Sequence, residues 1–267
     1  MQNKNSDITA GGGNKDTSWG KVAEWYDDLL STDGDSYQAQ VILPNLTRRL
    51  APKKGMAVLD LACGQGFFTR EWVKAGATVV ASDIAAPLIT LAQKQSPVPS
   101  AYHIAPAHDV SFVQSGTLDA VTIILALQNI ENLSAVCAEV SRVLKPGGIF
   151  YIVLNHPAFR IPKQSSWEWD KVGKAQYRRI DAYMTESRST IDMNPGTKEL
   201  SNKEHTVSFH RPLQVYAKLL GKAGFGITHI EEWISHKMSK PGPRAEEENR
   251  TRKEIPMFLL LEATKIK

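Results

Sequence analysis

A glycine-containing turn between two apolar segments is the part of this sequence best suited to chemistry. The apolar run Val58–Leu61 is followed by Ala62-Cys63-Gly64-Gln65-Gly66, and a helical pattern begins at Phe67. Glycines let the backbone approach a ligand closely, and the N-terminus of a helix offers N–H groups to it. Asp83 ends the next apolar run, where nucleotide-binding folds place an acid that accepts hydrogen bonds from ribose hydroxyls. The combination predicts a nucleotide-type ligand at this turn.

The same turn lacks two other nucleotide signatures. A dinucleotide loop needs a third small residue three positions after Gly66, but the chain has Thr69 there, preceded by two phenylalanines. A triphosphate loop needs Gly-Lys-Ser/Thr, which is absent here. Pyrophosphate binding is therefore disfavoured.

The elements expected around this turn alternate between strand and helix. Short apolar runs predict strands at 56–61, 78–82, 101–105, 120–125, 149–154, 227–235 and 257–265. Periodic patterns predict helices at 19–30, 39–50, 67–75, 87–94, 133–144 and 212–223. Such alternation implies βαβ units. The expected fold class is α/β, with a seven-stranded, mostly parallel sheet and helices on both faces.

The segment 155–211 interrupts this alternation of strands and helices. It is polar and aromatic, and we expect one helix around Asp170–Tyr183 and a ribbon that pairs Ser187–Met193 with His205–His210. Ligands bind at the carboxyl ends of strands in open α/β sheets, so 155–211 is expected to be an inserted substrate lid. The remainder divides into a flexible tail, 1–16, and one domain made of 17–154 and 212–267. Within that domain the charged stretch 236–256 is expected to be a solvated loop.

Three motifs together resemble a known family. Asp60–Gly66 (DLACGQG), Asp119–Asn129 (DAVTIILALQN) and Val143–Gly148 (VLKPGG) resemble class I S-adenosylmethionine-dependent methyltransferases. The sequence pattern is similar to that of the small-molecule branch of this family, which includes ubiquinone/menaquinone-biosynthesis methyltransferases. The resemblance covers roughly 19–154 and the final helix and strand pair. It implies a Rossmann-like sheet with an antiparallel last strand, and S-adenosyl-L-methionine as cofactor.

The resemblance also implies residue roles at the methionine end of the cofactor. The loop backbone would line the methionine part, the end of the fourth strand would face the sulfonium and amino group, and an N-terminal aromatic would cap the site. The positions that match these roles are Asp60, Ala62, Gly64, Gly66, Ile124, Leu125 and Tyr26.

At the adenosine end, Asp83 would hold both ribose hydroxyls and Ile84 would pack on the adenine. The family's Asp-Ala pair, which reads the adenine edge, appears here as Pro106-Ala107. Ala107 offers its N–H, and Asp109 is the expected substitute for the carboxylate that Pro106 lacks.

Residues of the inserted segment are candidates for acceptor binding and catalysis. Asn155-His156-Pro157 differs from the Asn/Asp-Pro-Pro turn of amino-group methylases, which follows the fourth strand, so we expect it to line the substrate pocket through Asn155. His210 and His156 are the expected general bases, because imidazole titrates near pH 7. Trp167 and Tyr177 are expected to bind substrate. The basic cluster Lys174–Arg179 allows two interpretations: it contacts an acidic substrate, or it forms a solvated helix face.

Composition narrows the remaining classes. Lys+Arg exceed Asp+Glu by 32 to 28, a net charge of +4, which disfavours a dedicated nucleic-acid binder. No apolar run reaches about 18 residues and no signal core is present, so we expect no membrane span and a cytoplasmic location. No Cys/His spacing predicts a metal. The interpretation is methyl transfer to a small molecule; an RNA-modifying methyltransferase and a non-catalytic cofactor-binding protein remain alternatives.

Overall fold

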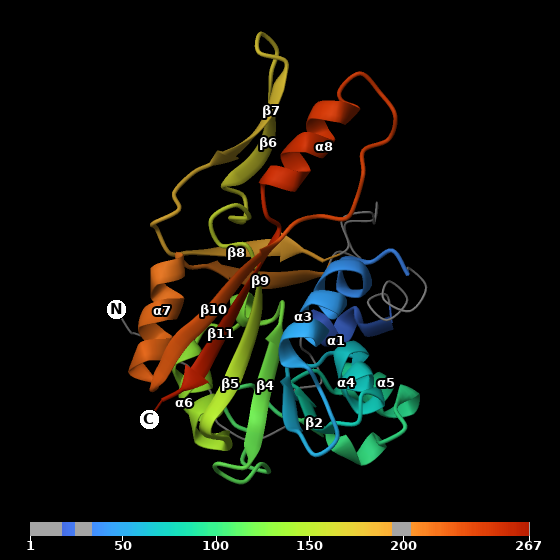
Figure 1. The fold of residues 1–267 in the computed structure, drawn as a ribbon, viewed down its shortest axis with the longest axis vertical. Coiled ribbons are helices and arrows are strands. Elements are labelled where there is room, and N and C mark those ends of the chain that lie inside the picture. The colour runs from blue at the N-terminus through green and yellow to red at the C-terminus, as the bar shows by residue number, and fades with distance from the viewer. Residues whose placement is uncertain (1–17, 25–33, 194–203, 267) are drawn as a thin grey trace, which may run out of the picture.

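The computed structural model describes residues 18–24, 34–193 and 204–266, and within them a seven-stranded sheet forms the centre (Figure 1). The strand order is β10-β11-β5-β4-β1-β2-β3. Neighbours among β1 to β5 pair in parallel, whereas β11 pairs antiparallel with both β5 and β10. The strands are β1 (Ala57–Leu61), β2 (Thr78–Asp83), β3 (Tyr102–Ile104), β4 (Leu118–Ile124), β5 (Leu144–Asn155), β10 (Phe225–Trp233) and β11 (Phe258–Lys265). The predicted α/β class and the antiparallel last strand are confirmed.

Helices cover both faces of this sheet. On one face α6 (Leu133–Val143) and α7 (Leu213–Lys222) pack on β4, β5 and β11. On the other, α3 (Leu43–Leu50) and α4 (Phe67–Lys74) enclose a second apolar cluster. Further elements are α1 (Ser18–Lys21), α5 (Ala86–Gln95), and the 3-10 turns η2 (Pro99–Ala101) and η3 (Leu127–Asn129). Parallel strands covered on both sides explain the nearly continuous apolar runs of the sequence.

The helix expected over 39–50 forms in two parts. A π-helical segment, η1 (Gln38–Ile42), leads directly into α3. Pro44 therefore lies in the first turn of α3, where its missing N–H leaves no helical hydrogen bond unmade. The α-helical part begins one residue before the proline, and the helical course of the chain is not interrupted.

The prediction of a helix around Asp170–Tyr183 is wrong. Strands β6 (Ser165–Asp170) and β7 (Ala175–Ile180) form an antiparallel hairpin there instead. The Oδ1 atom of Asp170 accepts a hydrogen bond from the N–H of Val172 at 2.9 Å, which closes the turn locally. The expected ribbon is confirmed, because β8 (Ser187–Asp192) pairs antiparallel with β9 (His205–His210).

The prediction of a solvated loop at 236–256 is also wrong, because this segment contains the helix α8 (Ala245–Glu254). Its first turn carries three glutamates and its last turn Arg252 and Lys253, which matches the helix dipole and was a signal available in the sequence. The guanidinium of Arg244 lies 4.7 Å from the Trp169 ring, and Glu247 accepts a hydrogen bond from the backbone of Gln176. We call β6, β7 and α8 the arm; it stands beyond the sheet and the β8–β9 ribbon (Figure 1).

Two predictions fall where the structure gives no description. The tail 1–16 and the proposed capping residue Tyr26 both lie outside the described residues. Within the described ranges, no helix has the length and apolar character needed to cross a bilayer.

Candidate functional site

The loop between β1 and α4 has the backbone geometry of a ligand cradle. Ala62, Gly64 and Gly66 adopt positive φ angles of 57°, 59° and 79°. A Cβ added at Gly66 would lie 2.7 Å from the hydroxyl oxygen of Tyr102, so only glycine fits. A small hollow of about 40 Å³ opens here, lined by Asp60, Ala62, Cys63, Gly64, Gln65, Phe67, Phe68 and Ile124. The structure thus places four predicted cofactor residues, Asp60, Ala62, Gly64 and Ile124, around one hollow.

The end of β4 borders the same hollow in an unusual conformation. Leu125 has a φ of 53°, which is costly for a branched residue and is typically found at functional sites. Its carbonyl oxygen accepts a hydrogen bond from Nε2 of Gln128 at 2.7 Å. Two left-handed, non-glycine residues, Ala62 and Leu125, therefore directly follow the neighbouring strands β1 and β4.

Asp83 is positioned by the loop that it faces. Its Oδ2 accepts a hydrogen bond from the Gly64 N–H at 2.9 Å, and its Oδ1 accepts one from the Ala85 N–H at 2.8 Å. Burial raises the pKa of this carboxyl above its usual value, while those backbone donors oppose the rise. Each carboxylate oxygen has a second lone pair, so the side chain can hold ribose hydroxyls while it fixes the loop.

Asp60 lies on the floor of the site, fully buried. It accepts hydrogen bonds from the hydroxyls of Thr69, at 2.6 Å, and Thr122, at 3.0 Å. Burial raises its pKa from 3.8 to about 6, against the effect of both threonines. Thr69 stands where a dinucleotide loop has its third glycine, and its hydroxyl ties α4 to Asp60 instead.

The predicted adenine contacts lie near the ends of β2 and β3. Ile84 is 47% exposed directly after Asp83, which leaves an apolar surface for a ring. Asp109 is exposed, and its Oδ1 accepts a hydrogen bond from the Ser111 N–H at 3.2 Å. Ala107, half-buried, precedes it in the same turn.

The two predicted histidine bases are both buried and already hydrogen-bonded. His156 contacts Glu232 Oε1 through Nε2 at 2.7 Å, and its Nδ1 accepts a hydrogen bond from the Ala158 N–H. Burial lowers the pKa of His156, and Glu232 opposes this. His210 donates from Nε2 to the carbonyl of Tyr183 at 2.8 Å, and no hydrogen bond to its Nδ1 occurs within the described residues. The imidazole lone pair that a general base needs already accepts a hydrogen bond at Nδ1 of His156, whereas Nδ1 of His210 accepts none from the described residues.

The predicted substrate residues do not form one cluster. Asn155 ends β5, half-buried and paired with Phe258. Trp167 pairs with Arg178 and Tyr177 with Glu168, in adjacent register positions of the arm hairpin. Adjacent pairs project to opposite faces of a hairpin, so Trp167 and Tyr177 cannot line the same wall.

Sequence reasoning missed the contacts that attach the ribbon to the loop after β4. Asn129 donates from Nδ2 to the Val207 carbonyl at 2.8 Å. Arg211 donates from Nη2 to the carbonyls of Ile130 and Glu131. These bonds hold part of the inserted segment against the end of β4, and no local pattern in the sequence predicts them.

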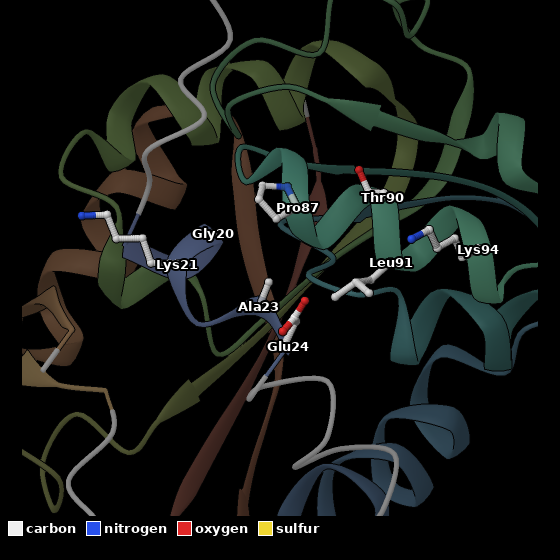
Figure 2. A pocket seen from close by; sticks show the side chains of 8 residues that line it. All are labelled: Gly20, Lys21, Ala23, Glu24, Pro87, Thr90, Leu91 and Lys94. Carbon is white, nitrogen blue, oxygen red and sulfur yellow. The ribbon is translucent and has the colours of Figure 1, made fainter. Parts of the chain in front are cut away.

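A larger recess of about 380 Å³ lies between α1 and α5. Figure 2 shows Gly20, Lys21, Ala23 and Glu24 on one side and Pro87, Thr90, Leu91 and Lys94 on the other. Pro87 lies in the first turn of α5, which follows Asp83 in the chain. No group of three potential metal ligands occurs in the part of the chain that the structure describes.

Comparison with known proteins agrees with this site. A family model described as a methyltransferase domain matches residues 59–152. A biotin biosynthesis bifunctional protein from Cellvibrio japonicus is 31% identical over 151 residues, which are 57% of this chain and 29% of that protein. A ubiquinone biosynthesis O-methyltransferase from Xanthomonas oryzae is 34% identical over 105 residues, 38% of this chain and 44% of that protein. The chain thus spans less than half the length of these two relatives.

Solved structures extend the likeness to most of the chain. An S-adenosylmethionine-dependent methyltransferase structure from Listeria monocytogenes is 26% identical, with a TM-score of 0.66, covering 84% of this chain and 97% of that one. One from Mesorhizobium loti is 25% identical, with a TM-score of 0.65, covering 83% and 96%. The sheet order, the glycine cradle and these matches are those of S-adenosylmethionine-dependent methyltransferases, in agreement with the predicted family and cofactor.

Proposed function

We propose that this chain transfers the methyl group of S-adenosylmethionine to a small-molecule acceptor by in-line displacement. The observation that carries the proposal is the cradle of Gly64 and Gly66, held by Asp83 at the carboxyl edge of the sheet. The groups present fit the cofactor, because Gly66 leaves no room for a side chain and Asp83 retains acceptor capacity.

When bound, the cofactor supplies a methyl group on an electrophilic sulfonium. Ala62 and Gly64 would hold its methionine part through the backbone, Asp83 its ribose, and Ile124 and Leu125 would exclude water from the reacting end. Such positioning contributes roughly 7–11 kcal/mol to lowering a bimolecular barrier. The segment 155–211 would act as the lid, since Asn129 and Arg211 hold the β8–β9 ribbon over the loop after β4.

Where the acceptor carries a proton that has to leave, His210 is the better base in this chain. Its Nε2 is anchored on Tyr183, which leaves Nδ1 as the basic nitrogen, whereas His156 uses Nδ1 to accept from Ala158. The small-molecule acceptor is supported by the names of the curated relatives, which belong to ubiquinone and biotin biosynthesis.

Calorimetry and a turnover assay test the proposal. We expect S-adenosylhomocysteine to bind in preference to NAD, and methylated product to form by mass spectrometry from at least one of a panel of hydroxyl, amine and carboxyl metabolites. Preferred binding of NAD would contradict the cofactor assignment. Tight cofactor binding without any product would favour the non-catalytic alternative.

A further inference from the structure

The side chain of Gln65 belongs to the cofactor loop and is held there by one arginine. Gln65 lies between Gly64 and Gly66, is 1% exposed, and is one of the residues that line the hollow at the end of β1. Arg70, in the first turn of α4, donates from Nη1 to the Gln65 carbonyl and from Nη2 to Gln65 Oε1, both at 2.7 Å. One guanidinium therefore fixes both the backbone and the side chain of Gln65.

This contact determines the orientation of the Gln65 amide. A guanidinium group only donates hydrogen bonds, so the side-chain atom that it contacts is the amide oxygen. The amide nitrogen, Nε2, carries two N–H donors and points away from Arg70. Nε2 is buried and forms no hydrogen bond within 18–24, 34–193 and 204–266. A buried donor without an acceptor is unfavourable, and native proteins contain few of them, so a residue of the cofactor hollow presents a donor that lacks its acceptor.

Stabilisation of the loop by Arg70 does not explain the amide nitrogen. In the part of the chain that the structure describes, both guanidinium hydrogen bonds of Arg70 end on Gln65. A carboxylate at position 65 would give Arg70 a stronger, charge-assisted partner, but it would have no N–H donors. The property that an amide adds at this position is therefore the donor capacity of Nε2.

We infer that Gln65 Nε2 donates a hydrogen bond to the carboxylate of the cofactor's methionine part, and that Arg70 is the positioning residue for this amide. A carboxylate only accepts hydrogen bonds, which matches the unpaired N–H donors. Asp83, which accepts from Gly64 in the same loop, is itself an acceptor and is suited to the ribose hydroxyls instead. Because Arg70 already fixes the amide, little rotamer freedom is lost when the ligand binds. The inference rests on the proposed function and deepens it, because it names a side chain that recognises the amino-acid end of the cofactor.

The test compares two ligands that differ only in the carboxylate. They are S-adenosylhomocysteine and its decarboxylated analogue, which keeps the adenosine, the thioether and the amino group. Calorimetry gives the Kd of each ligand for the full chain as wild type, Gln65→Glu, Gln65→Met and Gln114→Glu. Gln65→Glu retains an oxygen for Arg70 and replaces the N–H donors by a second, anionic oxygen. Gln114→Glu is the matched control, because Gln114 is exposed in the turn before β4, at the opposite edge of the sheet.

We expect wild type to bind S-adenosylhomocysteine at least about tenfold more tightly than the decarboxylated analogue. Gln65→Glu should lose most of this preference through weaker binding of S-adenosylhomocysteine alone, Gln65→Met should have a smaller preference than wild type, and Gln114→Glu should keep the full preference. Equal binding of the two ligands by wild type would overturn the inference.

Two results with the variants would also overturn it. One is an unchanged preference in Gln65→Glu or, where that variant does not fold by thermal unfolding, in Gln65→Met. The other is equal weakening of both ligands in Gln65→Glu, which is the result that a purely structural role of Gln65 would give. Failure of wild type to bind either ligand would refute the proposed function instead.

Discussion

Replacing Gly66 by alanine tests whether the cradle tolerates any side chain. Gly66 has a φ of 79°, and an added Cβ would lie 2.7 Å from the Tyr102 hydroxyl oxygen and 2.8 Å from the Cε1 of that ring. A left-handed conformation costs an alanine about 1–2 kcal/mol. Tyr102 is 4% exposed, so it cannot swing into solvent, and such overpacking costs about 1–3 kcal/mol more. The expected loss in the free energy of unfolding is therefore about 2–5 kcal/mol.

Gly147→Ala separates the two contributions. Gly147 has the same φ of 79°, but an added Cβ there would meet nothing within 4 Å. This control should lose only the conformational part, about 1–2 kcal/mol. It should also bind the cofactor normally, because Gly147 lies within β5 between the paired residues Leu144 and Ile149, whereas Gly66 closes the ligand loop.

Equilibrium unfolding in urea and calorimetric titration with S-adenosylhomocysteine measure both effects. We expect Gly66→Ala to lose more stability than Gly147→Ala and to lose most of its cofactor affinity. Equal destabilisation by the two substitutions would refute the argument from the Tyr102 contact. Unchanged cofactor affinity in a folded Gly66→Ala protein would show that the loop geometry is not needed for binding.

Four further predictions concern the site and the lid. Asp83→Ala should weaken S-adenosylhomocysteine binding at least about tenfold by calorimetry, because hydrogen bonds to a charged group are worth about 1.5–3 kcal/mol each; wild-type affinity would contradict the ribose role. His210→Ala should lower turnover by about 10²–10⁴-fold and leave the cofactor Kd unchanged, whereas His156→Ala should lower turnover by a smaller factor. Near-normal turnover in both variants would mean that alignment of the reactants alone drives the reaction. Replacing 167–183 by a short flexible linker should raise the KM for the acceptor more than the Kd for the cofactor, and equal losses would argue that this segment is only structural. Burial raises the pKa of Asp60 from 3.8 to about 6, so the native state holds a proton that the unfolded chain releases, and the stabilisation by this group is fully present below about pH 4 and is lost as pH rises through 6. Asp60→Asn should therefore be more stable than wild type at pH 8, by up to about 3 kcal/mol, and this difference in the free energy of unfolding should be smaller at pH 5. Urea unfolding at both pH values measures the difference, and the same difference at pH 5 and pH 8 would contradict the assignment.

The central sheet and the cofactor end of the site were predictable from the sequence because their determinants are local. Strands buried on both faces need continuous apolar runs such as 120–125. A loop with positive φ angles and a close neighbour needs glycine at Gly66. Asp83 was predictable for the same reason, because it directly follows a strand whose direction and neighbour are set by the βαβ pattern.

The arm shows where local reasoning ended. The residues 165–180 contain aromatic and charged side chains with no clean period, and the hairpin exists because β6 and β7 pair with each other and α8 covers β7. The helix α8 was hidden by its own polarity, since a helix with one small buried contact has no apolar stripe to recognise. Strand pairing and the contact with α8 identify the hairpin, whereas the only local signal for α8 was the order of its charges.

The roles of single polar side chains were decided only in three dimensions. The sequence by itself showed His156, His210 and the cluster Lys174–Arg179, and it predicted that a glycine loop and Asp83 lie at one edge of the sheet, as they do. The tertiary structure decided that His156 is engaged by Glu232 and Ala158, and that Arg178 is held by the carbonyl of Phe159 and the hydroxyl of Ser165. The physical reason is that hydrogen bonding and burial depend on residues distant in the chain, as Glu232 is 76 positions from His156, and no local pattern of residues specifies them.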